Sequence, residues 1–135
     1  MPLVRISFKQ DKSAAFRKSV ADAIQGGLIA AGVPEHDRFQ IMSSHGEDLI
    51  YDANYLDIAR SDGIVIVQIF LAAGRTVDKK RALYRGIVER LVRECQVRPE
   101  DVFINLIECA MENWSFGNGA AQYADAPPAH LAKPA

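Results

Sequence analysis

The chain repeats a short sequence at a distance of 64 residues. Residues 33–39 read VPEHDRF and residues 97–103 read VRPEDVF, and each copy lies between a helical pattern and a strand-like run. Such self-similarity indicates two copies of one supersecondary unit. The sequence therefore predicts two strand–helix–strand units, each with parallel strands and a helix that crosses one face of the sheet in the right-handed sense.

Apolar periodicity supplies the elements of both units. Apolar residues four positions apart predict two amphipathic helices, one that begins near Ser13 and ends near Gly32 and one that Thr76 caps. Runs rich in branched and aromatic residues predict four strands. These runs are residues 3–8, 39–45, 64–71 and 102–107. The result is an α+β (α/β) fold, a four-stranded mixed sheet with two helices on one face.

The third predicted strand, residues 64–71 (IVIVQIFL), is apolar on both faces. Such a strand belongs inside a sheet that is covered on both sides. Two helices cover only one face of a four-stranded sheet, so we expect an oligomer that buries the open faces together. A ferredoxin-like antiparallel sandwich has the same order of elements and stays open as an alternative. It usually joins its second and third strands by a tight hairpin, and the irregular residues 46–63 argue against it.

Composition narrows the class of protein. The 135 residues are 49 % hydrophobic and 24 % charged, which predicts one globular domain over residues 1–123 and an Ala/Pro-rich tail over residues 124–135. A net charge of −1 does not indicate the excess of positive charge that binding to nucleic acid or to an anionic membrane requires. We find no targeting segment or membrane span. Two cysteines and three histidines make no metal pattern, so we expect no metal site and a cytoplasmic protein.

The second residue is proline. If Met1 is removed, Pro2 presents a secondary amine that can take or give a proton. A strand that starts at the next residue would hold this amine far better than a loose terminus does. A proline that follows methionine without any function is the alternative.

Pro2, the two repeats and the expected oligomer together resemble the tautomerase superfamily. Three local matches are similar to its malonate semialdehyde decarboxylase-like branch: residues 33–40 (VPEHDRFQ), Arg75 just before the second helix, and residues 114–119 (WSFGNG). The resemblance covers about residues 2–123. It implies a β-α-β repeat fold assembled as a trimer, and an enzyme without metal or organic cofactor that acts on a small carboxylate.

The resemblance implies three catalytic residues. Pro2 would carry the proton. Arg75 would hold a substrate carboxylate or an enolate oxygen, and its alternative role is a solvated loop arginine. Asp37 would orient a water molecule or shift the pKa of Pro2. Its alternative is a structural role, as a capping residue or as an ion-pair partner of Arg38. Burial and Arg75 favour a neutral, basic Pro2, whereas Asp37 favours a charged, acidic one; the sequence leaves both open.

Four further residues are expected to bind substrate. Trp114 and Phe116 would form an apolar wall that dries the site, or would close the trimer interface instead. Gln40 would donate to a substrate oxygen or join the sheet edge, and Phe39 precedes it in the same motif.

One difference from the malonate semialdehyde decarboxylase-like branch decides which of the possible reactions we expect first. The pattern of that branch carries two arginines separated by one residue at the end of the third strand, but residue 73 is alanine here. The loss removes a charge-assisted contact to a carboxylate. Enol–keto tautomerisation of a small 2-oxo acid therefore ranks first, ahead of decarboxylation or hydration of a three-carbon acid such as malonate semialdehyde. A non-catalytic oligomeric binding module is the third possibility.

Overall fold

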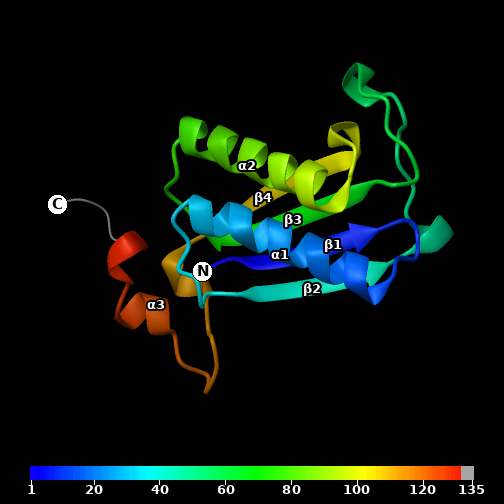
Figure 1. Ribbon diagram of the computed structural model, residues 1–135. Helices are drawn as coiled ribbons and strands as arrows, with labels where there is room; N and C mark the ends of the chain where they lie inside the picture. Colours follow the sequence, from blue (N-terminus) through cyan, green and yellow to red (C-terminus); the bar gives the residue numbers. More distant parts are fainter. Residues whose placement is uncertain (132–135) are drawn as a thin grey trace.

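A four-stranded mixed sheet organises the protein, whose computed structural model describes residues 1–131 (Figure 1). The strand order is β2-β1-β3-β4. β1 (Leu3–Phe8) runs parallel to β2 (Phe39–Ser44), and β3 (Val65–Ala72) runs parallel to β4 (Val102–Cys109). The two units meet where β1 pairs antiparallel with β3. The predicted mixed sheet of two β-α-β units is confirmed.

The direct pairing of β1 with β2 also removes the ferredoxin-like alternative. A split β-α-β unit places another strand between its own two strands, whereas here Leu3 lies opposite Phe39 and the two strands stay paired through Phe8 and Ser44. The connection between β2 and β3 contains two 3₁₀ turns, Gly46–Asp48 and Tyr55–Asp57, in place of a hairpin.

Two long helices cover one face of the sheet (Figure 1). They are α1 (Ala14–Ala30) and α2 (Val77–Cys95). Ser13 and Thr76 cap them, because each hydroxyl accepts a hydrogen bond from the backbone N–H three residues on, at 3.1 and 3.2 Å. Both caps satisfy a donor that the first helical turn leaves unpaired, as the sequence predicts.

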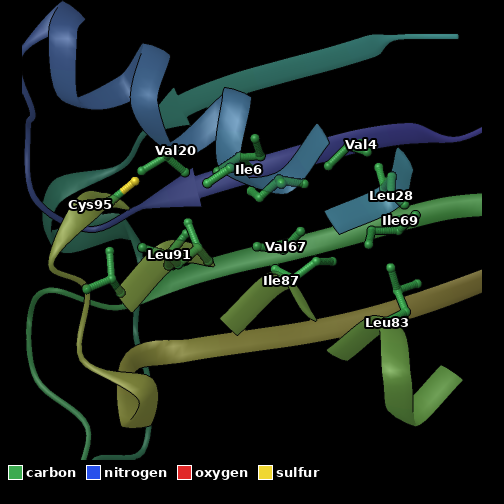
Figure 2. Packing of buried hydrophobic residues seen from close by; sticks show 14 of the residues in the cluster. Val4, Ile6, Val20, Leu28, Val67, Ile69, Leu83, Ile87, Leu91 and Cys95 are labelled. Atoms are coloured by element: carbon green, nitrogen blue, oxygen red, sulfur yellow. The ribbon is translucent and has the colours of Figure 1, made fainter. Parts of the chain in front are cut away.

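The core lies between this helical layer and the sheet. Figure 2 shows Ile6 and Val67 of the strands packed with Ile87 and Leu91 of α2. Cys95 belongs to the same cluster and is 5 % exposed. Burial raises the pKa of its thiol, so this cysteine fills the core and is not a nucleophile.

The other face of the sheet is uncovered. Side chains alternate along a strand, and those opposite the core include Phe39, Ile41 and Phe103, which are 53 %, 49 % and 45 % exposed. The single chain thus leaves an apolar sheet face in contact with solvent.

The C-terminal segment returns to one edge of the sheet (Figure 1). The helical turn α3 (Gln122–Asp125) crosses the start of the predicted tail, and the 3₁₀ turn Ala129–Leu131 lies within that tail. Residues 132–135 lie outside the described residues. Over residues 1–131, no helix combines the length and the apolar character that a membrane crossing needs.

Candidate functional site

Four strand ends meet at one edge of the sheet. The amino ends of β1 and β2 lie side by side there, since Leu3 pairs with Phe39. The carboxyl ends of β3 and β4 reach the same edge, since Leu3 also pairs with Phe70. Figure 1 shows the N-terminus, the start of α2 and α3 gathered at this edge. Residues far apart in sequence are therefore brought to one place.

The terminal amine is held between two charges at this edge. The Met1 nitrogen lies 3.3 Å from Asp37 Oδ2. Burial lowers the pKa of this amine below its ordinary value of 8.0, the carboxylate of Asp37 opposes that shift, and the guanidinium of Arg75 adds to it. Pro2 is buried directly behind Met1. Its nitrogen is an amide here, so the Met1 amine stands in for a prolyl amine one residue further along the chain.

Asp37 is held in place by hydrogen bonds of its backbone, and one of its carboxylate oxygens accepts no hydrogen bond from the described residues. Its N–H donates to Pro34 O at 3.1 Å, and Gln25 Nε2 donates to its carbonyl oxygen at 3.2 Å. Oδ1 is buried and has no hydrogen-bond partner within residues 1–131. Arg38 bonds instead to Asp22 at 2.8 Å and to Gln40 at 2.9 Å. The carboxylate of Asp37 thus faces the terminal amine and not its neighbour in sequence.

Arg75 lies between β3 and α2, where the sequence places it. Its Nη1 donates to Ala72 O at 3.0 Å. Burial lowers the pKa of the guanidinium, and the carboxylate of Glu108 partly opposes the shift. Glu108 itself accepts from Gly74 N–H at 3.1 Å and pairs with Lys80. Arg75 is therefore oriented by the backbone, with much of its positive charge uncompensated.

Three aromatic rings form a stack beside these charges. Trp114 and Phe116 lie nearly parallel, with ring centroids 5.5 Å apart, and Tyr123 meets Phe116 edge to face at 4.5 Å. Burial and the negative Asp37 raise the pKa of the Tyr123 hydroxyl, which places Tyr123 near that carboxylate. Trp114 Nε1 is buried without a hydrogen-bond partner among the described residues. The stack offers an apolar surface with one unused donor.

Tyr123 is a site residue that the sequence reasoning missed. It lies in a stretch without periodicity, and Gln122 beside it fixes the segment: its side chain accepts from Phe116 N–H and donates to Gly117 O, both at 2.9 Å. The only available signal was an aromatic residue shortly after the WSFGNG sequence.

Phe39 and Gln40 are not part of this grouping. Gln40 Nε2 donates to Ala21 O of α1 at 2.9 Å, and its Oε1 accepts from Arg38. Phe39 points to the open sheet face. A substrate contact by either residue stays a prediction. Among the described residues, no three histidine, cysteine or acidic side chains gather as metal ligands.

Comparisons with known proteins agree on one family. A family model described as "Tautomerase enzyme" matches residues 37–117. Probable tautomerase YusQ of Bacillus subtilis (strain 168) is 38 % identical over 124 residues, which are 90 % of this chain and 98 % of that protein.

Two solved structures are similar in fold and sequence. FG41 malonate semialdehyde decarboxylase, inhibited by 3-bromopropiolate, matches with a TM-score of 0.87 and 38 % identity, over 94 % of this chain and 98 % of that one. A malonate semialdehyde decarboxylase described with decarboxylase and hydratase activities matches with a TM-score of 0.85 and 30 % identity, over 91 % and 96 % of the two chains.

Proposed function

The chain belongs to the tautomerase superfamily, a family of enzymes, and from that premise we propose that it is a cofactor-independent tautomerase of a small 2-oxo acid. The observation that carries the proposal is the half-buried terminal amine between Asp37 and Arg75. An amine at the start of a paired strand is positioned well enough to transfer a proton.

The proposed reaction needs one base and one cation. After removal of Met1, the neutral Pro2 nitrogen takes the proton of the substrate's enol hydroxyl. It then delivers the proton to the other carbon of the enol double bond, which gives the keto acid. Arg75 holds the substrate carboxylate and the negative charge that develops on the enolate oxygen. The stack of Trp114, Phe116 and Tyr123 keeps water from this charge.

The direction of the amine's pKa shift supports the base over the acid. Burial is the largest influence on the terminal amine, and it disfavours the charged form; Arg75 acts in the same sense. A shift towards the neutral form suits an amine that abstracts a proton from an enol.

Decarboxylation or hydration of a three-carbon acid is the second candidate. Two solved malonate semialdehyde decarboxylases with 38 % and 30 % identity favour it. The unpartnered Oδ1 of Asp37 also offers an acceptor for a water molecule. Ala73, which is exposed and carries no charge, ranks this candidate below tautomerisation.

A homotrimer that buries the open sheet face completes the proposal. The exposed side chains of Phe39, Ile41 and Phe103 are unusual on the sheet of a monomer and typical of an interface.

Both cysteines are free thiols, as expected for a reducing cytoplasm.

The test is turnover by protein whose mass shows that Met1 is absent. We expect ketonisation of 2-hydroxymuconate or phenylenolpyruvate, and a fall in kcat/KM of at least about 100-fold in Pro2→Ala, since general acid–base catalysis contributes that much. Pro99→Ala, in the second copy of the repeat, is the matched control and should retain full activity.

Three outcomes separate the alternatives. Release of carbon dioxide from malonate semialdehyde without ketonisation would favour the decarboxylase. Turnover by Pro2→Ala at the wild-type rate would remove Pro2 from the mechanism, and no turnover of any of these substrates would favour a binding module.

A further inference from the structure

A short connection between β3 and α2 carries Arg75. Residues 73–76 are all that separates the strand from the helix. Gly74 and Arg75 line a cavity of about 800 Å³, which residues of the C-terminal segment, His130 among them, also line. The position of the guanidinium in this cavity therefore depends on how four residues of backbone are held in place.

Glu108 of β4 ties this connection to the sheet. It lies opposite Leu71 of β3 in the strand register, and its Oε2 accepts from Gly74 N–H at 3.1 Å. The φ of Gly74 is +123°, a conformation that residues with a side chain rarely adopt. The carboxylate of Glu108 thus holds the turn at the residue that directly precedes Arg75.

Lys80, close to the start of α2, pairs with the other carboxylate oxygen of Glu108. Lys80 and then Gly74 N–H lower the pKa of Glu108, which favours its charged form. The side chains of Lys80 and Glu108 are 25 % and 31 % exposed, and ion pairs so open to solvent add little to the stability of a fold. The place in which Lys80 holds the carboxylate is therefore the more important effect of this pair.

Glu108 is close to Arg75 without being bonded to it. Its charge partly opposes the fall in the pKa of the guanidinium that burial causes. Within residues 1–131, however, no hydrogen bond or ion pair joins the two side chains, and Arg75 donates to Ala72 O instead. A carboxylate this close, if it were free, would compete with a bound anion for the same N–H donors.

We propose that Glu108 is a positioning residue for Arg75: it fixes the β3–α2 connection through Gly74 N–H, and Lys80 holds its carboxylate away from the guanidinium. The cation is thereby left for the substrate. This role rests on the proposed function, in which Arg75 holds the substrate carboxylate. Glu108 lines no part of the cavity, so it acts through Arg75 and not by contact with the substrate.

The test measures by calorimetry how tightly phenylpropionate binds, since this carboxylate lacks a reacting carbonyl group. In Lys80→Met, Glu108 is free to pair with Arg75, and binding should be at least about fivefold weaker, because one charge-assisted contact must break before another forms. Lys80→Arg keeps the pair and should bind as the wild type does.

A second substitution should restore what Lys80→Met removes. In Lys80→Met combined with Glu108→Gln, the amide oxygen still accepts from Gly74 N–H but no longer competes for Arg75. The affinity should return to within about twofold of wild type, as a thermodynamic cycle requires of two residues that act on one group. A pair with only a structural role would show no such rescue, because removing the second partner would not repair the loss of the first.

Glu108 is tested alone by two substitutions. Glu108→Gln keeps the acceptor for Gly74 N–H and should keep the affinity. Glu108→Ala leaves that N–H without its acceptor, and binding should weaken at least about threefold because Arg75 is less well oriented. Lys18→Met is the matched control, since it breaks an ion pair with Asp22 on the distant helix α1 and should not change the affinity. Thermal melts of all variants report whether the fold is intact.

The positioning role is overturned if Lys80→Met or Glu108→Ala binds as tightly as wild type, or if adding Glu108→Gln to Lys80→Met restores nothing. Arg75→Gln separates this result from the proposed function. If Arg75→Gln abolishes binding, the role of Arg75 stands, and the other variants decide the role of Glu108. If Arg75→Gln binds as the wild type does, or the wild type does not bind, Arg75 does not hold the carboxylate and both roles fail.

Discussion

At the scale of single residues, the terminal amine lies between a carboxylate that raises its pKa and a guanidinium that lowers it. Asp37 and Arg75 act in opposite senses, so burial, the largest influence, sets the direction of the shift. Burial thus shifts the terminal amine towards its neutral form, while Asp37 limits how far the pKa falls.

Removing the carboxylate should move the pH–rate profile in a known direction. In Asp37→Asn the amine loses the group that raises its pKa, so the neutral form appears at lower pH. The acidic limb of kcat/KM should shift to lower pH relative to wild type, even where the maximum rate falls. Arg75→Gln should shift the limb to higher pH. Asp48→Asn, an exposed carboxylate on the β2–β3 connection, is the control, and identical limbs in all four proteins would contradict the arrangement.

The places of Pro2, Asp37 and Arg75 in the fold were predictable because each lies next to the end of an element that periodicity locates, whereas their roles came from the family resemblance and stay predictions. Elements that end at the same sheet edge bring such residues together. Tyr123 and His130 were not predictable, since they reach the edge only through the path of the C-terminal segment, which has no periodic pattern. Gln40 was identified correctly as a strand residue. Its side chain lies on the face of the sheet that α1 covers, where it bonds to that helix. Which face it takes depends on the register of β2, and the sequence does not show that register.

At the scale of elements, the two helices pack so closely that one position tolerates only glycine. A Cβ added to Gly27 of α1 would lie 2.7 Å from Ile87 Cγ1 of α2. α2 begins at Val77, two residues after Arg75, so the distance between the helices also affects where Arg75 lies.

Gly27→Ala should lower the free energy of unfolding despite better helix propensity. Alanine gains about 1 kcal/mol over glycine in a helix, but overpacking a core costs about 1–3 kcal/mol, so we expect a net loss of about 1 kcal/mol in urea unfolding. Gly86→Ala of α2 is the control: the side-chain atom closest to the added Cβ would be Arg90 Nη1 at 3.6 Å, and the variant should gain about 1 kcal/mol in the free energy of unfolding. A Gly27→Ala protein as stable as Gly86→Ala would contradict the close packing.

The repeat gives its two copies different uses. Asp101, the counterpart of Asp37, is 2 % exposed, and its two oxygens accept from Ser61 N–H at 2.7 Å and from the Ser61 hydroxyl at 2.6 Å. Asp37 keeps an oxygen that has no hydrogen-bond partner within residues 1–131. The sequence shows that Asp37 and Asp101 are equivalent positions. It does not show which of the two carboxylates has its hydrogen bonds satisfied within the fold, because that depends on the position of Ser61. Ser61 lies in a connection without periodicity, so its position was not predictable.

At the scale of the whole molecule, the open sheet face sets the expected assembly. The sequence was sufficient to predict the open face, because two helices cannot cover both sides of four strands. It could not give the geometry of the partner, which depends on surfaces formed only after folding.

Sedimentation should give a particle of about three times the 14.9 kDa chain mass. Ile41→Glu, which places a charge on the open face at the edge strand β2, should shift the particle towards monomer, because an unpaired charge in an interface is strongly unfavourable. Ile50→Glu is the control, since Ile50 is 91 % exposed and lies outside the sheet. A monomeric wild type, or a trimer that survives Ile41→Glu, would rule out this interface.

The most direct test of the central claim is a nitrogen-15 NMR titration of Met1-free protein labelled at proline. We predict one titrating prolyl nitrogen whose midpoint lies below that of an N-terminal proline in an unstructured peptide, the direction in which burial shifts the Met1 amine, and coincides with the acidic limb of kcat/KM for ketonisation. A prolyl nitrogen that titrates above that value, or a limb that does not follow it, would contradict the account of Pro2 as a buried base beside Arg75.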